Sequence, residues 1–409
     1  MKKNKVPEIR FSGFTDDWEQ RKLGEFTKLI TKGTTPKDKS SAGNINFVKV
    51  ENLSNGKITP LTRILQDEHD GYLKRSKLEE NDILFSIAGT LGRTAIVNKE
   101  ILPANTNQAL AIIRGYKFDT NFLITSLNGH VVAEYIRKNP TVGAQPNLSL
   151  EQVGNLQINT PTVLEQQKIG SFFKKIDDTI DLHQRELEIL KNTKKAFLQK
   201  MFPKYGEKVP EVRFPGFTDD WEHCKLNKLA KFSKGKGYTK NDLKSNGKEI
   251  ILYGRLYTKY ETEITNIDTF VESDAGAVKS EPGDVIVPAS GETSKDISRA
   301  SVVVKEGIIL GGDLNIIKTK NEELSPVFLS LTISNGSQQK ELIKRAQGKS
   351  VVHLHNSDLE KVSVNMPSIE EQQKIGVFFK KLDNTIALHQ RELTILQKTK
   401  KAFLQKMFV

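Results

Sequence analysis

Few groups of residues in this chain have the types and spacing that catalysis requires. Residues 348–350 (Gly-Lys-Ser) match the end of a phosphate-binding P-loop, but Ile343 stands where that loop needs its first glycine. Residues 139–142 (Asn-Pro-Thr-Val) come nearest to the Asn/Asp-Pro-Pro-aromatic loop of an adenine methyltransferase, and they lack its second proline and its aromatic ring. Neither segment predicts an active site.

Two further groups suggest nuclease or metal chemistry. Glu281 and Asp284 could form a carboxylate pair, but Pro-Gly-Asp before an apolar run is more simply a turn that enters a strand. His353 and His355 stand two residues apart without a cysteine cluster, which is typical of a strand face rather than of a metal site. We therefore expect no catalytic residue, no metal site and no cofactor.

Polar side chains in glycine-rich loops fit a different chemistry, the recognition of DNA. Arg93 has the donors to pair with guanine, while Gln108 and Asn147 could pair with adenine. The alternative is that such side chains only satisfy the backbone of turns. The residues predicted to contact DNA are Lys32, Thr34, Lys37, Thr90, Arg93, Gln108, Gln145, Asn147, Lys234, Lys236, Tyr238, Lys240, Ser290, Thr293, Ser294 and Lys295.

The charge and composition favour a polyanionic partner in a reducing compartment. The net charge is +12, and its densest cluster is seven lysines within residues 228–248, opposed only by Asp242. This segment is either a phosphate-contacting loop or a solvated surface loop. Cys224 is the only cysteine, and no stretch approaches the roughly 20 apolar residues of a membrane span. We expect a cytoplasmic protein with no membrane contact.

The organisation of the chain follows from an internal repeat. Residues 6–23 return at 209–226 with 14 of 18 positions identical, and residues 165–202 return at 371–408 with 31 of 38 identical. The inserts between these blocks, 24–163 and 227–366, differ almost completely in sequence. Near-identical blocks predict two equivalent structural positions, and divergent inserts predict two different tasks.

The longer block predicts a helix with a coiled-coil seam. Its apolar residues alternate at spacings of four and three, and each copy is the natural partner of the other in an antiparallel pair. His183 and His389, like Lys194 and Lys400, fall in this seam, and we interpret them as polar positions that fix register rather than as metal ligands. The seam residues are Ile169, Phe173, Ile176, Ile180, Leu187, Leu190, Phe197, Ile375, Phe379, Leu382, Ile386, Leu393, Leu396 and Phe403.

The inserts are rich in predicted strands. Alternating or continuous apolar runs predict strands at 44–50, 81–89 and 94–98 in the first insert, and at 248–256, 283–291, 300–304 and 307–318 in the second. Glycine- and asparagine-rich turns separate them, with one or two short helices such as 122–138. Each insert is therefore an α+β domain rather than a dinucleotide-binding fold.

These motifs together carry a resemblance to a known family. The repeated VPE-[IV]-RF-x-GFTDDWE opening and the repeated EQQKIG-x-FFKK helix closely resemble those of type I restriction-modification specificity subunits. The inserts resemble the target-recognition domains of that family at residues 31–37, 81–97 and 143–153, and again at 233–240, 283–293 and 310–315. The resemblance covers essentially the whole chain.

The resemblance implies an architecture and a set of partners. The implied fold is α+β, with two strand-rich target-recognition domains separated by an antiparallel coiled coil of two long helices, in a pseudo-two-fold arrangement. The expected segments are 1–163, 164–202, 203–366 and 367–409. The implied partners are double-stranded DNA, two methyltransferase subunits, and motor-nuclease subunits. Each recognition domain would read one half of a bipartite asymmetric target, and the chain itself would be non-catalytic.

Two other functions compete with this interpretation. One is a nuclease–methyltransferase with its own active site, which the motif failures described above disfavour. The other is a coiled-coil adaptor that holds two different proteins and does not bind DNA. Binding of the purified chain to random duplex DNA, with and without a methyltransferase partner, would separate these alternatives.

Overall fold

The computed structural model describes residues 6–37, 42–60, 62–139, 147–320, 322–348 and 351–408. The chain divides into two compact units. Unit 1 comprises residues 1–185 and 391–409, and unit 2 comprises residues 186–390. Each unit therefore combines one insert with part of each long helix, so the compact units cut through the helices rather than separating them from the inserts.

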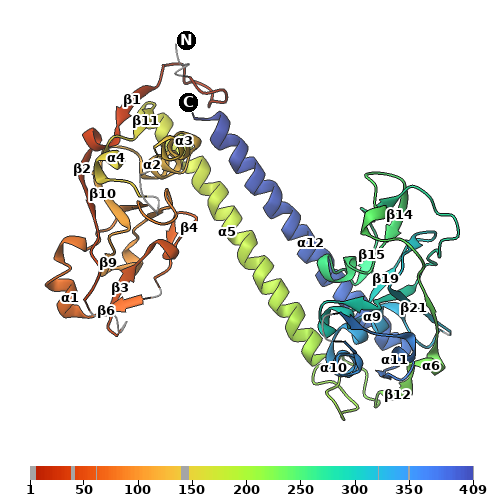
Figure 1. Ribbon diagram of the computed structural model, residues 1–409. Coiled ribbons are helices and arrows are strands. Elements are labelled where there is room, and N and C mark those ends of the chain that lie inside the picture. Colours follow the sequence, from red (N-terminus) through yellow and green to blue (C-terminus); the bar gives the residue numbers. More distant parts are fainter. Residues whose placement is uncertain are drawn as a thin grey trace. The chain divides into compact units, whose positions relative to one another are not determined.

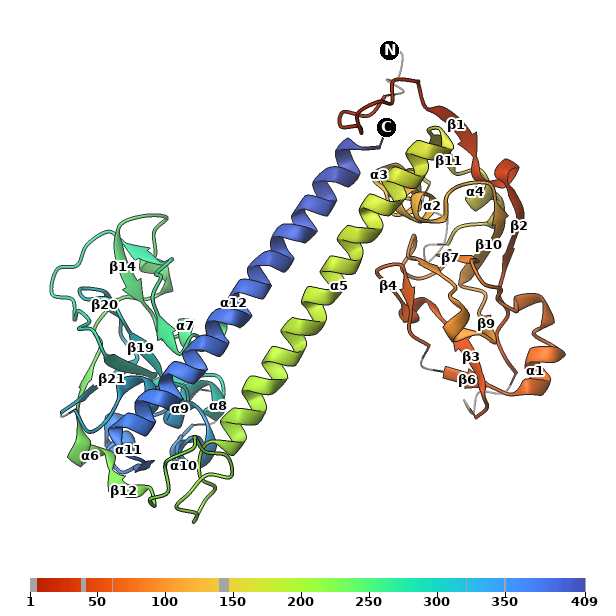
Figure 2. The same ribbon diagram turned by 180° about the vertical axis from the view of Figure 1, so that it is seen from behind.

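Unit 1 is built on a four-stranded and a three-stranded sheet, two isolated strand pairs and a set of short helices. The four-stranded sheet has the order β2-β10-β7-β8, and β3 lies between β6 and β9 in the other (Figure 2). The described elements are β1 (Glu19–Lys22), β2 (Thr27–Lys32), β3 (Ile45–Val48), β4 (Leu53–Ser54), β5 (Lys57–Ile58), β6 (Thr62–Ile64), α1 (Gln66–Asp70), β7 (Ile83–Ser86), β8 (Thr94–Ile96), β9 (Ala104–Thr106), β10 (Leu110–Tyr116), α2 (Thr120–Leu127), α3 (His130–Lys138), α4 (Leu150–Gly154), β11 (Gln157–Thr160) and the first part of α5 (Val163–Lys200).

Unit 2 repeats this plan with different residues. Its main sheet has the order β13-β21-β17-β19-β15, and β14 lies between β16 and β20 (Figure 1). The described elements are β12 (Glu222–Lys225), α6 (Leu226–Leu229), β13 (Ala230–Lys234), β14 (Lys248–Ile251), α7 (Arg255–Thr258), β15 (Glu263–Ile264), β16 (Phe270–Val271), β17 (Asp284–Pro288), β18 (Ser290–Gly291), α8 (Ser294–Ile297), β19 (Ser301–Val303), β20 (Ile309–Leu310), β21 (Leu314–Thr319), α9 (Pro326–Ser334), α10 (Gly336–Arg345), β22 (Val352–His353), α11 (Asn356–Leu359), β23 (Ser363–Met366) and α12 (Ile369–Lys406).

The strand registers make the two inserts equivalent. Ile83 of β7 pairs with Ile113 of β10, as Val285 of β17 pairs with Ile317 of β21. In both units a parallel pair, β3 with β9 and β14 with β20, stands beside the main sheet. Because apolar strands of similar length can be built from many residue combinations, two unrelated-looking sequences adopt one topology.

Strand β7 illustrates why these runs become central strands. All four of its residues, Ile83–Ser86, are buried, since the sheet is covered on both faces and leaves no polar side to the strand. The Asp82 carboxylate accepts a hydrogen bond from the Glu79 backbone N–H at 2.7 Å and closes the turn that enters the strand. Asp284 does the same with the Glu281 N–H at 2.9 Å, so that carboxylate is a turn residue, and burial raises its pKa.

The repeated helix start anchors each insert. Gln166 accepts a hydrogen bond from the Asp119 backbone N–H at 3.0 Å, just before α2, and Gln372 accepts one from Ser325 at 3.0 Å, just before α9. A Cβ on Gly170 would lie 2.5 Å from Asp119 Oδ1, so α2 can approach α5 only at a glycine. The EQQKIG motif is thus a docking motif for the first helix of each insert.

The repeated opening segment is held by a buried ion pair. Arg10 donates to both carboxylate oxygens of Glu165, at 2.7 and 2.8 Å, and the Glu165 side chain is fully buried. This hydrogen bonding raises the pKa of Arg10 above its usual value, so the guanidinium stays charged. In unit 2, Arg213 makes the same bidentate contact with Glu371, with both distances 2.7 Å.

The two long helices run antiparallel in each unit (Figures 1 and 2). In unit 1 the Phe172 ring meets the Phe403 ring edge-on, with centroids 5.1 Å apart, and Lys400 pairs with Asp177. In unit 2 the corresponding contacts are Phe197 with Phe378, at 5.0 Å, and Lys194 with Asp383. The predicted α+β class with an antiparallel helix pair is confirmed.

The predicted seam residues all lie buried or half-buried, but they do not all face the other helix. Ile169 and Phe173 belong to the core of the first insert, where Phe173 packs against Phe408 with ring centroids 5.8 Å apart. Ile375 and Phe379 belong likewise to the core of the second insert. The helix pair and the inserts therefore share one core in each unit, which ties each insert rigidly to its scaffold.

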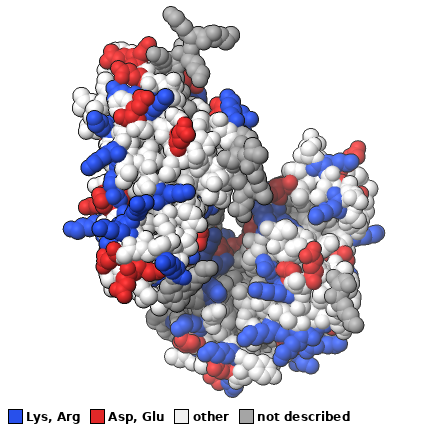
Figure 3. Space-filling model, turned by 60° about the vertical axis from the view of Figure 1, so that its left-hand side comes forward, with Lys and Arg blue, Asp and Glu red and all other residues white. Residues whose placement is uncertain are grey.

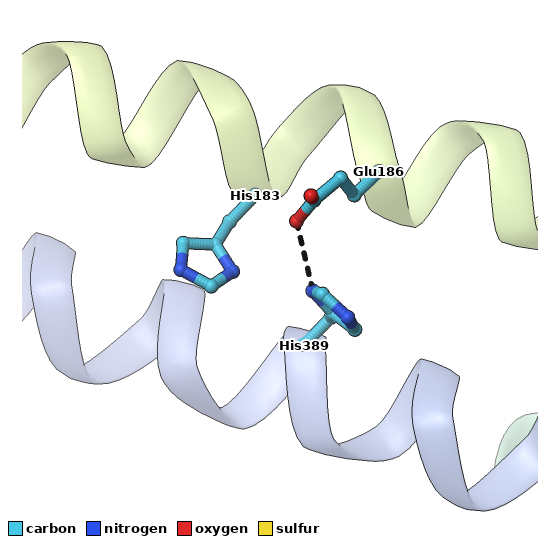
Figure 4. Close-up of side chains that lie close together, drawn as sticks. All are labelled: His183, Glu186 and His389. Carbon is cyan, nitrogen blue, oxygen red and sulfur yellow. Dashed lines mark ion pairs between the residues drawn. The ribbon is translucent and has the colours of Figure 1, made fainter.

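The polar seam positions form reciprocal ion-pair contacts. His183 Nδ1 lies 3.5 Å from Glu392 in unit 1. His389 Nδ1 lies 3.4 Å from Glu186 in unit 2, the ion pair drawn as a dashed line in Figure 4. Each histidine side chain is about four-fifths buried, with exposed fractions of 21% and 20%. The same pairing in both units agrees with the interpretation of these residues as register-fixing positions.

Three sequence predictions of element boundaries were wrong. The strand predicted over 248–256 ends at Ile251, and Arg255 begins α7. The other two errors have one cause. The run 307–318 was predicted as one strand, but it forms β20 and β21, which are separated by Gly311 and Gly312. The predicted helix over 122–138 is two helices, α2 and α3, because Asn128 and Gly129 end the first one. In both places small turn-forming residues interrupt a continuous apolar pattern.

Candidate nucleic-acid interface

The exposed loops of unit 1 gather at one edge of its main sheet. Strand β10 is antiparallel to β2 and β7, and β8 is antiparallel to β7, so the ends of β2 and β7 and the starts of β8 and β10 share an edge. Three loops lie there, at residues 33–37, 87–93 and 107–109. Together they are called loop edge 1. It brings together most of the first-insert residues predicted to contact DNA.

Those residues are mostly exposed and lie on separate loops. Asn147 joins them because it forms an antiparallel bridge with Ala88, in the loop 87–93. Gln145 lies outside the described residues. Lys32, Lys37, Thr90, Arg93, Gln108 and Asn147 are exposed, and Thr34 is half-buried.

The backbone of loop edge 1 is fixed independently of these side chains. The Gly33 N–H donates to Leu110 O at 3.2 Å, and the Thr34 N–H donates to Thr106 O at 2.9 Å. A Cβ on Gly33 would lie 2.1 Å from Thr106 O, so only glycine fits there. The hydroxyl of Thr35 donates to the Gln108 side chain, which links two of the loops.

The loop that carries Arg93 is held by a buried serine. Ser86 Oγ accepts from the Arg93 backbone N–H at 2.7 Å and donates to Thr90 O at 2.6 Å. Gly89 and Gly92 have φ values of 74° and 79°, which the tight turn requires. Because the turn is satisfied by Ser86 and by the backbone, the side chains of Thr90 and Arg93 are left for an external partner.

Unit 2 has the equivalent edge, loop edge 2, formed by the loops 235–240, 289–300 and 311–313. Strand β21 is antiparallel to β13 and β17, and β19 is antiparallel to β17. The Gly235 N–H donates to Leu314 O at 2.9 Å, as Gly33 does to Leu110, and a Cβ on Gly235 would lie 2.0 Å from Gly311 O. The same backbone device therefore positions different side chains.

The second-insert candidates divide into exposed and structural residues. Lys234, Lys236, Lys240 and Lys295 are exposed, whereas Tyr238 is half-buried and donates to Ser273 O at 2.9 Å. The three hydroxyl candidates have structural roles, although Thr293 is exposed. Ser290 is only 5% exposed and pairs with His353 across a strand bridge, Thr293 caps α8 through Asp296, and Ser294 begins that helix. At these positions the turn-and-cap alternative fits better than a direct base contact.

One residue of loop edge 2 was missed by the sequence reasoning. The strand register makes Arg299 equivalent to Arg93. Val302 pairs with β17 as Ile96 pairs with β7, and each arginine lies three residues before that position. The signal was present in the sequence, because Gly-Arg-Thr-Ala-Ile-Val at 92–97 aligns with Ser-Arg-Ala-Ser-Val-Val at 298–303. Arg299 stacks over Tyr260, with its guanidinium carbon 5.5 Å from the ring centroid.

Charge on the surface is mixed rather than uniform. Lysine and arginine side chains are interspersed with acidic ones over the face seen in Figure 3, with local patches of blue. The lysine cluster 228–248 is spread over the end of α6, β13, the segment after it and the start of β14, so its members do not form a single loop. In the part of the chain that is described, no helix is long and apolar enough to cross a membrane.

The chain is thus built from two equivalent modules. Each module has polar loops at one end of its main sheet and shares a core with the helix pair. A family model described as "Type I restriction modification DNA specificity domain" matches residues 15–192 and 218–398, one copy in each repeat. The chain belongs to this family, and is a specificity subunit of the type I restriction-modification class.

One relative and one solved structure match over nearly the full length of this chain, and a second relative matches over part of it. The chain is 22% identical to the type I restriction enzyme MjaVIII specificity subunit of Methanocaldococcus jannaschii, covering 94% of this chain and 91% of that protein. It is 27% identical to the Escherichia coli EcoBI specificity subunit over 38% of this chain and 34% of that one. The fold matches that of a type I S subunit from M. genitalium, with a TM-score of 0.66, 15% identity and 99% of both chains covered.

Proposed function

We propose that this chain binds DNA sequence-specifically and directs methylation and restriction by partner subunits, with each insert reading one half of a bipartite asymmetric target. One observation carries the proposal. Loop edges 1 and 2 occupy equivalent places in one topology, yet they present different side chains, for example Thr34 and Gln108 where unit 2 has Lys236 and Gly312. Equivalent frames with different exposed groups are what two readers of unlike half-sites need.

The chemistry is assigned to the partners. In this proposal methyltransferase subunits modify the target and motor-nuclease subunits cleave, while the chain supplies position and specificity. The turn role of Asp284 and the strand-and-cap roles of His353 and His355 support this division, because they give structural tasks to residues that could have suggested catalysis.

The helix pair offers docking surfaces for two methyltransferases. Lys174 and Lys380, at equivalent places, are 55% and 52% exposed, although each has a local acidic partner, Asp178 and Glu263. Large apolar side chains outside the seam are also exposed and identical in both helices: Leu182 at 55%, Ile189 at 64%, Leu388 at 54% and Ile395 at 52%. Exposed apolar residues repeated in both copies are typical of a protein interface, so we expect two equivalent docking faces.

Exchange of one insert tests the reading of half-sites. Residues 24–163 are replaced by the first insert of a relative, and the methylated sequence is determined in cells that carry the partner subunits. We expect only one half of the bipartite target to change. The reciprocal exchange of residues 227–366 is the matched control and should change only the other half. If either exchange alters both halves, or neither, the inserts are not independent readers.

The stoichiometry tests the docking faces. The mass of the complex of this chain with its methyltransferase partner should correspond to two methyltransferases per chain. A stable complex with one or three would contradict two equivalent faces.

A further inference from the structure

Unit 2 contains a large basic cleft that adjoins loop edge 2. Its volume is about 980 Å³, and eight of its lining side chains are lysine or arginine against two carboxylates, Glu211 and Asp383. We name it the scaffold cleft. It is bounded by the end of α5, the segment 202–205 that follows, the connection from β17 to β19, and helix α10.

Most of the positive charge in the scaffold cleft is uncompensated. Asp383 pairs with Lys194, and Glu211 pairs with Lys200 at 2.7 Å and with Lys204 at 3.7 Å. Among the described residues, no carboxylate forms an ion pair with the remaining five lining cations. These are Lys191 and Lys195 of α5, Lys295 and Arg299 of the β17–β19 connection, and Lys340 of α10.

Like charges gathered around a concave surface repel one another, and a bound polyanion relieves that repulsion. Four of the five cations, all except the half-buried Arg299, are exposed lysines. Lysine acts as a mobile point charge and suits phosphate groups rather than the geometry of base edges. The cleft is also far larger than one phosphate group requires.

The position of two of these residues indicates that the polyanion is DNA. Lys295 and Arg299 lie both in the wall of the scaffold cleft and in loop edge 2, so the cleft opens beside the edge where the second half-site would lie. Lys191 and Lys195 are about 6 Å apart along the axis of α5, a span that matches about two phosphates of one DNA strand at roughly 3.4 Å each.

We propose that the scaffold cleft binds the phosphate backbone of the DNA that flanks the half-site read by unit 2. This inference rests on the proposed function and adds a second, sequence-independent contact to it. The cleft then contributes affinity for any duplex, whereas loop edge 2 contributes discrimination between sequences.

The test neutralises three lysines of the cleft that are not part of loop edge 2. The full-length variant K191Q/K195Q/K340Q is compared with wild type for binding to a random-sequence duplex of about 30 base pairs at several KCl concentrations. Each lost phosphate contact lowers the slope of log K against log salt by about 0.9, so we expect a slope smaller by about 2 to 3. The preference for the target over random DNA should be unchanged, because phosphate contacts carry no sequence information.

The matched control removes the same charge elsewhere in unit 2. Lys225, Lys228 and Lys361 are exposed, line no part of the scaffold cleft, and lie near the opposite end of β13. The variant K225Q/K228Q/K361Q should keep a slope close to that of wild type. Equal slopes for the two triple variants would overturn the proposal, and equal slopes with loss of partner assembly only in the cleft variant would assign the cleft to an acidic protein segment instead.

Failure of the scaffold-cleft proposal and failure of the proposed function give different results in these measurements. If wild type shows no preference for its methylated target over random DNA, sequence-specific reading by this chain fails. The comparison of salt slopes between the two variants still decides whether the scaffold cleft contacts phosphate groups.

Discussion

Replacing Arg10 by methionine should strongly lower the stability of unit 1 against unfolding, although Arg10 lies in an opening segment without regular secondary structure. The substitution keeps the apolar stem and removes the guanidinium that neutralises Glu165. The Glu165 side chain has no exposed surface, and Arg10 is its bidentate partner at 2.7 and 2.8 Å. The variant therefore leaves a buried carboxylate without its cation.

The magnitude follows from that burial. Removing one partner of a buried ion pair costs about 3–5 kcal/mol, because the remaining charge is neither solvated nor paired. Unit 1 has 204 residues. For domains of that size each kcal/mol shifts the melting temperature by about 2–4 °C, so the midpoint should fall by about 10 °C.

The equivalent variant in unit 2 provides an internal comparison. Arg213 makes the same bidentate contact with Glu371 and also donates from Nη1 to Asp219 O at 2.7 Å, whereas the buried Nη1 of Arg10 has no partner among the described atoms. Arg213→Met should therefore cost about 1 kcal/mol more than Arg10→Met, the value of an additional hydrogen bond.

The two tryptophans of the chain make the assay specific to each unit. Trp18 lies in the core of unit 1 and Trp221 in that of unit 2, with exposed fractions of 1% and 3%. Denaturant unfolding is followed by fluorescence in a Trp221→Phe background for Arg10→Met and in a Trp18→Phe background for Arg213→Met. Glu165→Gln combined with Arg10→Met should recover part of the loss. A loss below 1 kcal/mol, or no recovery, would refute the argument from the buried charge.

Three further predictions concern the seam and the loop edges. Ile180→Asp places a carboxylate at a position that is 5% exposed, so it should destabilise unit 1 by several kcal/mol and abolish protection of DNA from restriction. The control is Leu182→Asp, at a position that is 55% exposed, which should leave the thermal stability unchanged. Arg93→Ala should weaken binding to the target by about 1–3 kcal/mol and relax the preference at a single base pair. Competition with single-base variants of the target measures this preference, and a uniform loss of affinity over all sequences would contradict a base contact. Gly33→Ala forces the backbone away from Thr106 O and should cost about 1–3 kcal/mol of stability and abolish reading of the first half-site only, as judged from the methylated sequence.

The scaffold was predictable from the sequence because its information is local and duplicated. The spacing of apolar residues in 165–202 and 371–408 predicts one seam, and the antiparallel direction follows from the connectivity. What the pattern could not show is that Ile169 and Phe173 turn into the insert core. A periodic apolar position identifies a buried face of a helix, and it does not say which neighbour covers that face.

The equivalence of the two inserts could not be predicted from their residues. Strands β2 and β13, with the sequences TKLITK and AKFSK, are partly exposed strands with weak apolar patterns, and they were not predicted. Their place depends on antiparallel pairing with β10 and β21, which lie some 80 residues further along the chain. The common position of Arg93 and Arg299 has a short sequence signal, the alignment of residues 92–97 with 298–303, but it takes the strand register to show that this alignment is structural.

The glycines at 33 and 235 allow the folding stability of the loops and the choice of their exposed side chains to vary separately, although these two properties usually conflict in a binding protein. The loops next to them are held by backbone N–H and C=O groups, so their side chains carry little of the folding energy. Substitutions at Thr34 or Lys236 can therefore accumulate at small thermodynamic cost, while the frame that presents them stays unchanged. A lineage of such proteins can acquire new specificities through neutral drift at the loops, without passing through unstable intermediates.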